Sequence, residues 1–420
     1  MFIYTVKPGD SLFSISAKYG TTVDSLRAVN GLLTGEVVPG LALVINLSVY
    51  TVQPGDSLYS ISQMTFVPVN VLIAANPTLN VNSLQPGMKV VIPRYPDYKV
   101  TTLGFTVLQT PELDRALIRD FAPYSTYIGI FEYHIGYDGS LSELNDQPAI
   151  DTAKGVRVAP LATITNLTAT GFDRDVVTTV LRSPGLRQTL IDNIFNIVTS
   201  KGYAGVCIDF EQVAPYDRDY YSDFLRQLRD RFRPAGLVLT VAVPAKTGED
   251  VPWLQGYDFG AIGSVVDLMF LMAYDFHEQS SEPGPVAPIN DVRQTVQFAL
   301  NNVSRDKLLL GVPLYGYDWP IPYSPDNPGR AIAVQDIVNL AIRYGVPIQY
   351  SQEYQSPYFQ YVDESGQNHI VWFEDPRSMG IKMQLVYQYR LRGLGAWQLN
   401  LSLPQGPYLL VQFFTIRKVL

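Results

Sequence analysis

The sequence YAGVCIDFE, at residues 203–211, carries the clearest structural signal in this chain. Apolar residues alternate in it with Cys207, Asp209 and Glu211, which is the period of two that a β-strand shows. Residues two apart in a strand share a face, so these three side chains point the same way. In a parallel barrel the two carboxylates would lie at the C-terminal end of the strand, where barrel enzymes hold their active sites. A solvated edge strand is the alternative for an isolated pair of acids.

Eight apolar runs follow residue 100, and the helical patterns between them predict βα units. The runs are Leu103–Val107, Tyr127–Tyr133, Val156–Thr165, Gly205–Glu211, Leu237–Pro244, Val266–Asp275, Lys307–Tyr315 and Gly393–Leu399. Eight is the number that closes a (β/α)8 TIM barrel of the α/β class, and about 320 residues is a normal length for one with insertions. An open doubly wound sheet is the alternative, but no G-x-G-x-x-G follows the first run.

One segment is longer than a crossover helix requires. Residues 319–373, between the seventh and eighth runs, contain aromatic pieces at 350–361 and 370–373 that are typical of strands. We therefore expect a small inserted α+β subdomain there, forming one wall of a cleft on the catalytic face.

The composition is that of a folded protein and excludes several partners. The chain has 420 residues, 47% hydrophobic and 17% charged, which is enough for a sizeable core. A net charge of −8 without a basic cluster argues against nucleic acid. The N-terminus lacks the basic and apolar regions of a secretory signal. No apolar run reaches the roughly 18 residues that a membrane helix needs.

Cysteine, histidine and tyrosine usage narrows the chemistry further. A single cysteine leaves no intramolecular disulfide framework. Three histidines stand without ligand spacing, so we expect no metal and no cofactor. Tyrosine is abundant, with 27 residues, and tyrosine-rich surfaces suit sugars because the rings stack on C–H faces while the hydroxyls form hydrogen bonds.

The first hundred residues contain a repeat. YTVKPGDSL at 4–12 returns as YTVQPGDSL at 50–58, and each copy predicts a strand, a Pro-Gly turn, two helices and a closing strand. Asp10 and Asp56, each followed by serine, are placed to cap the first helix of their copy. A unit of about 45 residues is small for an independent core.

Both copies resemble the LysM module, which implies a βααβ fold and binding of N-acetylglucosamine polymers such as peptidoglycan or chitin. The expected domains are 1–47, 48–95 and a barrel at 96–420. In the LysM family the sugar lies between the loop after the first strand and the loop before the second. The resemblance therefore assigns glycan contacts to Gly9, Asp10, Ser11, Leu12, Asn30, Gly55, Asp56, Ser57, Leu58 and Asn76. A turn and a helix cap alone would also account for the Gly-Asp pairs.

The region after residue 100 resembles glycoside hydrolase family 18, the chitinase-type barrel. The signature of the family on its fourth strand is D-G-x-D-x-D-x-E, and AGVCIDFE at 204–211 matches its last two acids. Ala204 and Cys207 replace the first two. LMAYD at 271–275 is similar to the family's M-x-Y-D on strand six, and GAW at 395–397 lies where the family places a tryptophan beneath the sugar. The resemblance covers nearly all of residues 100–420.

The matched acids suit a reaction in which the substrate supplies the nucleophile. Asp209 and Glu211 are about 6.6 Å apart along one strand, so they approach the sugar from one side. Ordinary retaining hydrolysis instead uses two carboxylates that flank the bond, and family 18 is a substrate-assisted exception. In that family the 2-acetamido oxygen of the substrate attacks C1 and forms an oxazolinium intermediate.

The resemblance implies a role for each matched residue. It assigns catalysis to Glu211, Asp209 and Tyr274, and substrate binding to Asp275, Trp397 and Cys207. Glu211 would protonate the leaving oxygen and later activate water. Asp209 would accept the acetamido N–H, Tyr274 would donate its hydroxyl to the acetamido group, and Trp397 would form the floor. Packing would also account for the two aromatic residues, and a helix cap for Asp275.

Cys207 is the informative departure from the signature. In the family an aspartate there shares a proton with the next aspartate, because adjacent like charges raise one pKa. A neutral thiol shares a proton less readily. We therefore expect Asp209 to stay ionised throughout the cycle, with the acid limb of the pH–rate profile shifted down.

The mechanism restricts the bond that is cut. The sugar that contributes C1 needs a free 2-acetamido group, which muramic-δ-lactam of spore cortex lacks, so cleavage in cortex would follow N-acetylglucosamine. The layout resembles the cortical fragment-lytic N-acetylglucosaminidases of bacilli, which implies a role in germination and a place in the outer layers of the spore, at the coat/cortex boundary, or otherwise at the cell wall. A chitinase and a catalytically inactive glycan-binding barrel are the alternatives, and the oligomeric state stays open.

Overall fold

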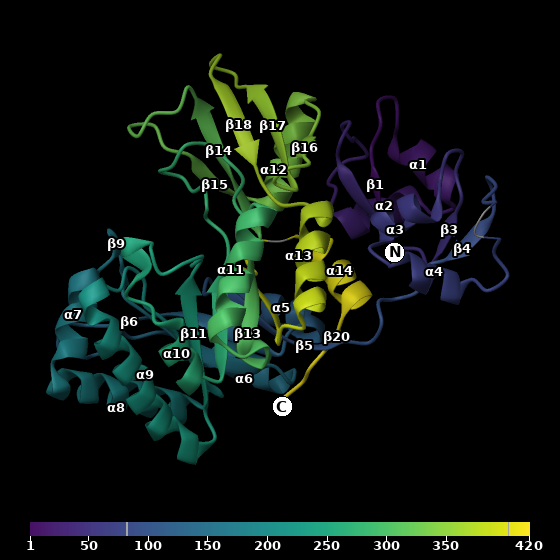
Figure 1. Ribbon diagram of the computed structural model, residues 1–420. Helices are drawn as coiled ribbons and strands as arrows, with labels where there is room; N and C mark the ends of the chain where they lie inside the picture. Colours follow the sequence, from purple (N-terminus) through teal and green to yellow (C-terminus); the bar gives the residue numbers. More distant parts are fainter. Residues whose placement is uncertain (81–82, 402) are drawn as a thin grey trace.

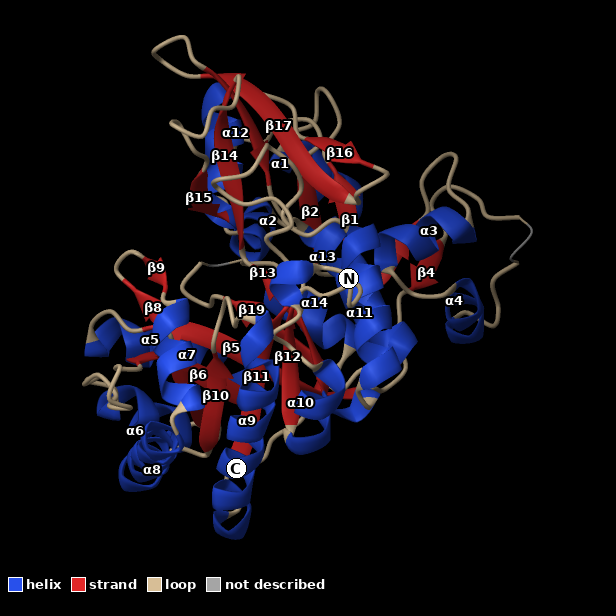
Figure 2. Cartoon of the chain, turned by 60° about the vertical axis from the view of Figure 1, so that its left-hand side comes forward, coloured by secondary structure: helices blue, strands red, loops and turns tan. Residues whose placement is uncertain are grey.

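The computed structural model describes residues 1–80, 83–401 and 403–420. Two small N-terminal modules lie beside a parallel barrel, and an antiparallel sheet stands over one end of that barrel (Figure 1). Helices surround the barrel strands on the outside (Figure 2). Among the described residues no single helix is long and apolar enough to cross a membrane; α3 (Leu58–Thr65) and α4 (Val69–Ala75) pass such a test only as a pair bent by 102°.

Eight parallel strands close the barrel and confirm the predicted fold class. They are β5 (Lys99–Val107), β6 (Tyr127–His134), β7 (Ala159–Thr165), β10 (Gly205–Asp209), β11 (Val238–Pro244), β12 (Leu268–Met272), β13 (Leu308–Pro313) and β19 (Gly393–Trp397). Each strand pairs with the next, and β19 pairs with β5. The fourth and sixth strands end two and three residues before the predicted runs do, so Glu211, Tyr274 and Asp275 follow strands rather than lie in them.

Helices and short strands complete the barrel. The helices are α5 (Pro111–Phe121), α6 (Gln147–Gly155), α7 (Arg174–Arg182), α8 (Pro184–Lys201), α9 (Arg218–Phe232), α10 (Phe259–Val265), α11 (Ile289–Asn302), α13 (Pro376–Tyr389) and α14 (Gly406–Phe413). A two-residue hairpin of β8 (Leu167–Thr168) and β9 (Gly171–Phe172) follows β7. Strand β20 (Thr415–Ile416) pairs with the start of β5.

Two phenylalanines fill much of the barrel interior. The rings of Phe105 and Phe270 meet edge to face with centroids 5.1 Å apart, inside a buried cluster drawn from seven of the eight strands. Gly311 and Gly395 leave the room that Phe270 takes, because a Cβ at either would lie 2.8 or 2.6 Å from its ring. The bulky rings thus make this interior a packed core rather than a channel.

The predicted insertion is present and begins earlier than expected. It consists of β14 (Tyr315–Ile321), β15 (Arg330–Ala333), α12 (Val334–Tyr344), β16 (Gln349–Ser351), β17 (Ser356–Val362) and β18 (Asn368–Trp372). The strand order is β15-β14-β18-β17-β16, and all pairs are antiparallel. The seventh barrel strand ends at Pro313, and Tyr315 already pairs with Ala333, so the insertion starts at 315 rather than 319.

The N-terminal repeat folds as two βααβ modules. The first contains β1 (Phe2–Thr5), α1 (Leu12–Tyr19), α2 (Val23–Asn30) and β2 (Ala42–Ile45), and the second contains β3 (Val49–Thr51), α3, α4 and β4 (Lys89–Val91). The predicted aspartate caps are wrong. Ser11 and Ser57 are the N-caps, each in a capping box with the serine three residues later.

The two aspartates instead close the preceding turns. Asp10 accepts hydrogen bonds from the hydroxyl of Tyr4 (2.6 Å) and the backbone N–H of Lys7 (2.8 Å). Asp56 accepts the equivalent bonds from Tyr50 (2.6 Å) and Gln53 (2.7 Å). Repetition of this contact shows that it belongs to the module's own architecture.

Four of the predicted glycan contacts in these modules are corrected by burial. Asn30 is fully buried and holds the backbone of Val44 from both sides, accepting its N–H at 2.7 Å and donating to its carbonyl at 3.0 Å. Asn76 does the same to Val91. Leu12 and Leu58 are buried as the first residues of α1 and α3. The spacing of all four is therefore a packing signal, because these side chains lie inside the modules.

The modules are packed on the catalytic body. The backbone N–H of Ile348 donates to the carbonyl of Pro39 at 2.9 Å, and Arg377 donates to the carbonyl of Gly40. In the second module, Phe66 lies against Gly380 of α13, where a Cβ would come within 2.2 Å of its ring. One hydrophobic cluster runs through both modules and the outer layer of the barrel. Each small module therefore gains core that it could not bury alone.

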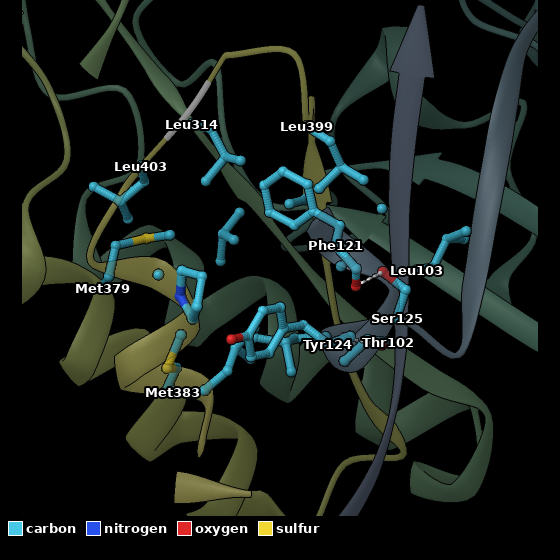
Figure 3. Close-up of a pocket in the computed structure, with 18 residues that line it drawn as sticks. Thr102, Leu103, Phe121, Tyr124, Ser125, Leu314, Met379, Met383, Leu399 and Leu403 are labelled. Carbon is cyan, nitrogen blue, oxygen red and sulfur yellow. Dashed lines mark hydrogen bonds between the residues drawn. The ribbon is translucent and has the colours of Figure 1, made fainter. Parts of the chain in front are cut away.

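An apolar cavity of about 70 Å³ lies in the barrel wall (Figure 3). Figure 3 shows Leu403, Met379 and Met383 on the left of the view and Leu314 and Leu399 along its top. Its lining comes from β5, β13 and β19 together with α5, α13 and α14. None of the acids predicted for catalysis lines it, so it is a feature of wall packing.

Candidate active site

Asp209 and Glu211 lie at the C-terminal end of β10. Asp209 is the last residue of the strand, is 6% exposed, and shares a face with Cys207 of the barrel interior. Glu211 follows two residues later and is half-buried. Its backbone enters a turn in which Gln212 has a φ of +56°. The strand thus delivers both carboxyl groups to the mouth of the barrel, where βα loops form active sites.

The backbone around Glu211 is fixed by two residues that the sequence analysis did not identify. Asn166, just after β7, accepts the N–H of Glu211 and donates to its carbonyl, both at 2.9 Å. Tyr257 donates its hydroxyl to the carbonyl of Phe210 at 2.9 Å. Asn166 directly follows a predicted strand, and that position was the one signal available for it.

Burial sets the protonation of the two acids. Loss of water, with the negative charge of Glu132 adding to it, raises the pKa of Asp209 to about 7. Loss of water also raises the pKa of Glu211 well above its ordinary value, and the charges of Asp209 and Asp275 add to this effect. Glu211 is therefore held in the protonated form that a general acid needs.

The expectation that Asp209 stays ionised with a low pKa is wrong. That expectation rested only on the effect of residue 207 on the pKa of Asp209, because a thiol there replaces the carboxyl of the family signature. In the folded barrel a carboxyl from another strand, Glu132 of β6, supplies the like charge instead. The pKa of Asp209 therefore rises although its neighbour on β10 is neutral.

Tyr274 and Asp275 follow β12 at the same end of the barrel. Burial raises the pKa of Tyr274 well above its ordinary value, and the charges of Asp275, Asp209 and Glu211 add to it, so the phenol stays a hydrogen-bond donor. Asp275 accepts hydrogen bonds from the hydroxyls of Tyr315 (2.7 Å) and Tyr317 (3.0 Å). Loss of water raises the pKa of Asp275 to about 6, although the hydrogen bonds from the two hydroxyls act to lower it.

Aromatic rings form the floor and one wall of the basin. Trp397 ends β19 and meets Phe131 edge to face at 4.7 Å. Alternate residues of β14 (Tyr315, Tyr317 and Trp319) form a buried cluster with Trp372 of β18, and Tyr274 and Trp397 pack against it. The sequence analysis placed Trp397 here but assigned Tyr315 to the seventh barrel strand, so it missed the start of this wall.

The assignment of Cys207 to substrate binding is corrected. The thiol is fully buried within the barrel interior, among Leu103, Phe105 and Leu309. Burial raises its pKa well above the ordinary value, and the charge of Asp209 adds to this. Cys207 therefore packs beneath Asp209, out of reach of a sugar in the basin.

The five groups around the mouth form one electrostatic unit. Asp209, Glu211, Asp275, Tyr274 and Glu132 come from the ends of β6, β10 and β12. Within the described ranges no three His, Cys, Asp or Glu side chains are grouped as ligands of a metal ion. A buried carboxylic acid beside a second carboxyl, at a barrel mouth walled by aromatic rings, is typical of enzymes that cleave glycosidic bonds.

Comparison with known proteins agrees with this class. The model of glycosyl hydrolases family 18 matches residues 174–401, and the LysM domain model matches 4–46 and 50–93. The chain is 56% identical, over 100% of both proteins, to YdhD of Bacillus subtilis (strain 168), whose name assigns it provisionally to sporulation-specific glycosylases. It is 35% identical to the cortical fragment-lytic enzyme of Bacillus anthracis over 99% of each. The crystal structure of the Bacillus cereus spore cortex-lytic enzyme SleL superposes with a TM-score of 0.90 at 34% identity, over 99% of each chain.

The chain belongs to glycosyl hydrolase family 18 and carries two LysM domains at its N-terminal end. It is a glycoside hydrolase, as the resemblance noted in its sequence implied.

The raised pKa of Asp209 predicts a pH-dependent effect of Asp209→Asn on stability. The folded state holds this proton up to about pH 7 while the unfolded chain releases it near pH 4, so stability falls as pH rises between these values. The substitution removes that cost, which is at most about 4 kcal/mol for three pKa units. We expect the variant to gain stability over wild type at pH 8 and little at pH 4.

Thermal unfolding at both pH values measures this difference. Asp120→Asn, at an exposed site on α5, is the matched control and should leave both curves in place. Equal shifts for Asp209→Asn at pH 4 and pH 8 would contradict the assignment of the pKa.

Proposed function

We propose that this enzyme hydrolyses the β-1,4 bond after N-acetylglucosamine in peptidoglycan, by a retaining, substrate-assisted mechanism, and that spore cortex fragments are its substrate during germination. The observation that carries the mechanism is the Glu211 carboxyl beside Asp209 at the barrel mouth, where loss of water raises its pKa. The names of the relatives, a cortical fragment-lytic enzyme and a spore cortex-lytic enzyme, support the substrate.

Each matched residue of the basin has a defined role in this mechanism. Glu211 gives its proton to the leaving oxygen while the acetamido oxygen of the substrate attacks C1, and it later removes a proton from the attacking water. Asp209, as the anion, accepts the acetamido N–H and balances the positive charge that develops. Tyr274 donates its hydroxyl to the acetamido group. Asp275 lies near the distorted sugar, and Trp397 forms its floor.

The aromatic wall supports a polymeric substrate. The rings of β14 and β18 in the insertion pack with Tyr274 and Trp397 at the barrel mouth. Sugar faces stack on such rings, and their hydroxyl groups add hydrogen bonds. A glycan longer than one sugar can therefore contact these rings in addition to the catalytic acids.

The LysM domains serve as glycan-binding modules in this proposal, with 1–47, 48–95 and 96–420 as the functional units. Gly9, Asp10, Ser11, Gly55, Asp56 and Ser57 stay as proposed contacts, since each has some surface in contact with solvent. The modules would hold the enzyme on cortex glycan in the outer layers of the spore, at the coat/cortex boundary.

Digestion of two substrates tests the function. Purified cortical muropeptides and chitin oligomers are incubated with wild type and with Glu211→Gln, and new reducing ends are identified by mass. We expect N-acetylglucosamine at the new reducing end of cortex fragments, first released as the β-anomer. Removal of the acetyl group from that sugar should abolish cleavage, because the nucleophile is gone.

The alternatives give different products. A chitinase would cleave the chitin oligomers and leave cortex fragments intact, and an inactive glycan-binding barrel would release nothing from either. Reducing ends of muramic acid, or products first released as the α-anomer, would overturn the proposed bond or the proposed mechanism.

A further inference from the structure

Glu132 is a half-buried acid of the basin that the proposed mechanism does not use. It lies on β6, which is separated from Asp209 on β10 only by β7. Within the described residues, Oε2 of Glu132 and Oδ1 of Asp209 are both buried without a hydrogen-bond partner. Two such carboxyl oxygens at one barrel mouth are costly unless a proton or a substrate group satisfies them.

His134 contacts Glu132 through one ring nitrogen and a backbone carbonyl through the other. Nδ1 of His134 lies 2.6 Å from the carbonyl oxygen of Leu167, and a carbonyl only accepts, so Nδ1 carries hydrogen. Nε2 of the same ring lies 3.3 Å from Oε1 of Glu132. With Nδ1 protonated, this second contact is attractive only if a further proton lies on Nε2 or on the carboxyl. With that proton in place, the pair has no net charge.

His134 is the cation that contacts Glu132, and its charge counters the rise that loss of water gives the pKa of Glu132. The strand residues registered beside the pair are uncharged, since Thr165 of β7 pairs with His134 and Val107 of β5 pairs with Phe131. The titratable groups described around this end of the barrel include Asp209, Glu211, Tyr274, Asp275, Tyr315 and Tyr317, with Cys207 buried beneath them, and all of these are acids. The charge of Glu132 thus depends on His134.

We infer that Glu132 and His134 form a positioning pair that controls the ionisation of Asp209, the task for which residue 207 offers only a buried thiol. While the pair holds its proton it is neutral, and Asp209 can become the anion that the positive intermediate requires. When the pair loses that proton, the bare Glu132 carboxylate opposes a second negative charge at Asp209. The direction of the pKa of Asp209, which the charge of Glu132 raises, agrees with this coupling.

The inference deepens the proposed function and rests on it, because it assumes that Asp209 works as the anion. In this chain the ionisation of Asp209 would depend on Glu132 and His134 of β6, two strands away, rather than on residue 207 of β10. The only bonds that change are O–H and N–H bonds within the pair, and no electrons are transferred.

Two substitutions should move the acid limb of kcat/KM in opposite directions. Glu132→Gln removes the negative charge, so Asp209 should ionise more easily and the limb should shift to lower pH by about one unit. His134→Gln removes the cation that neutralises Glu132, so the limb should shift to higher pH by a similar amount. In the double variant, with no Glu132 charge left to neutralise, the profile should resemble that of Glu132→Gln.

A purely structural role would lower kcat without this pattern. Shifts in the same direction, or no shift in either variant, would overturn the inference. Asp120→Asn is the charge control and should leave the profile unchanged. If Glu132→Gln fails to fold, as judged by circular dichroism, the upward shift of His134→Gln still decides the matter.

The outcome is separable from that of the proposed function. If Glu211→Gln abolishes turnover while the Glu132 and His134 profiles match wild type, only the pair is wrong. If Glu211→Gln retains full turnover, the proposed mechanism is wrong, whatever the pH profiles are.

Discussion

Glu211→Gln should lower kcat on N-acetylglucosamine-containing substrates by about 10²–10⁴-fold, the range that a general acid usually contributes. Glutamine keeps the size of the side chain but has no acidic proton for the leaving oxygen. Loss of water and the charges of Asp209 and Asp275 hold this proton on Glu211 in the native site. Steady-state rates on chitin oligomers and on cortical muropeptides measure the loss.

The control must separate chemistry from folding and binding. Glu364→Gln changes a glutamate on the insertion whose side chain is 73% exposed, and it should keep wild-type rates. Glu211→Gln should still bind the oligomers and should unfold at a temperature no lower than wild type, because it removes a carboxyl whose charged form is disfavoured at this site. Turnover within threefold of wild type would remove Glu211 from the mechanism.

Lys382→Met should destabilise the protein by about 3–5 kcal/mol, the usual cost of leaving one partner of a buried ion pair uncompensated. Nζ of Lys382 donates to Oε2 of Glu374 at 2.8 Å, and the side chains are 1% and 0% exposed. Glu374 follows β18, where the insertion returns to α13. Chemical denaturation at pH 8, where the lone carboxyl is hardest to keep neutral, measures the effect.

Two further variants test the physical cause. Adding Glu374→Gln to Lys382→Met should recover part of the stability, since no uncompensated charge remains in the core. Arg343→Met breaks the pair with Glu364, in which both side chains are more than 60% exposed, and should change stability little. A Lys382→Met variant as stable as Arg343→Met would show that the buried pair does not hold this junction.

The barrel could be predicted because its evidence is local. Alternating and continuous apolar runs identify strands wherever they occur in a chain, and each of the eight predicted runs overlaps a barrel strand. Strand ends were less certain: Glu211 and Asp275 were expected inside strands and lie just beyond them. The hydrogen bonds that end a strand come from distant residues, as Asn166 and Tyr257 do for the segment after Asp209.

The same division explains the errors in the LysM repeat. The Pro-Gly turns and the 46-residue period are local features of the sequence, and they predicted the module correctly, whereas the caps proved to be Ser11 and Ser57 rather than the aspartates. Whether Asn30 faces a sugar or the backbone of Val44 depends on how two helices and a hairpin pack together. A polar residue at a regular spacing is compatible with a sugar contact or with a hydrogen bond to the backbone. Burial of Asn30 leaves the hydrogen bond to the backbone.

From the order of its residues alone, this chain could be read as a family 18 barrel with two LysM modules and an acid pair on the fourth strand. Those features repeat along the chain at short range, where periodicity and motif spacing act. Only the tertiary structure determines which groups interact. The charge of Glu132 acts on Asp209, and Tyr315 and Tyr317 donate hydrogen bonds to Asp275. Cys207 is buried beneath the acids. Charges and hydrogen bonds act through space, so the pKa values that make this basin a catalyst exist only once barrel closure has brought the strands together.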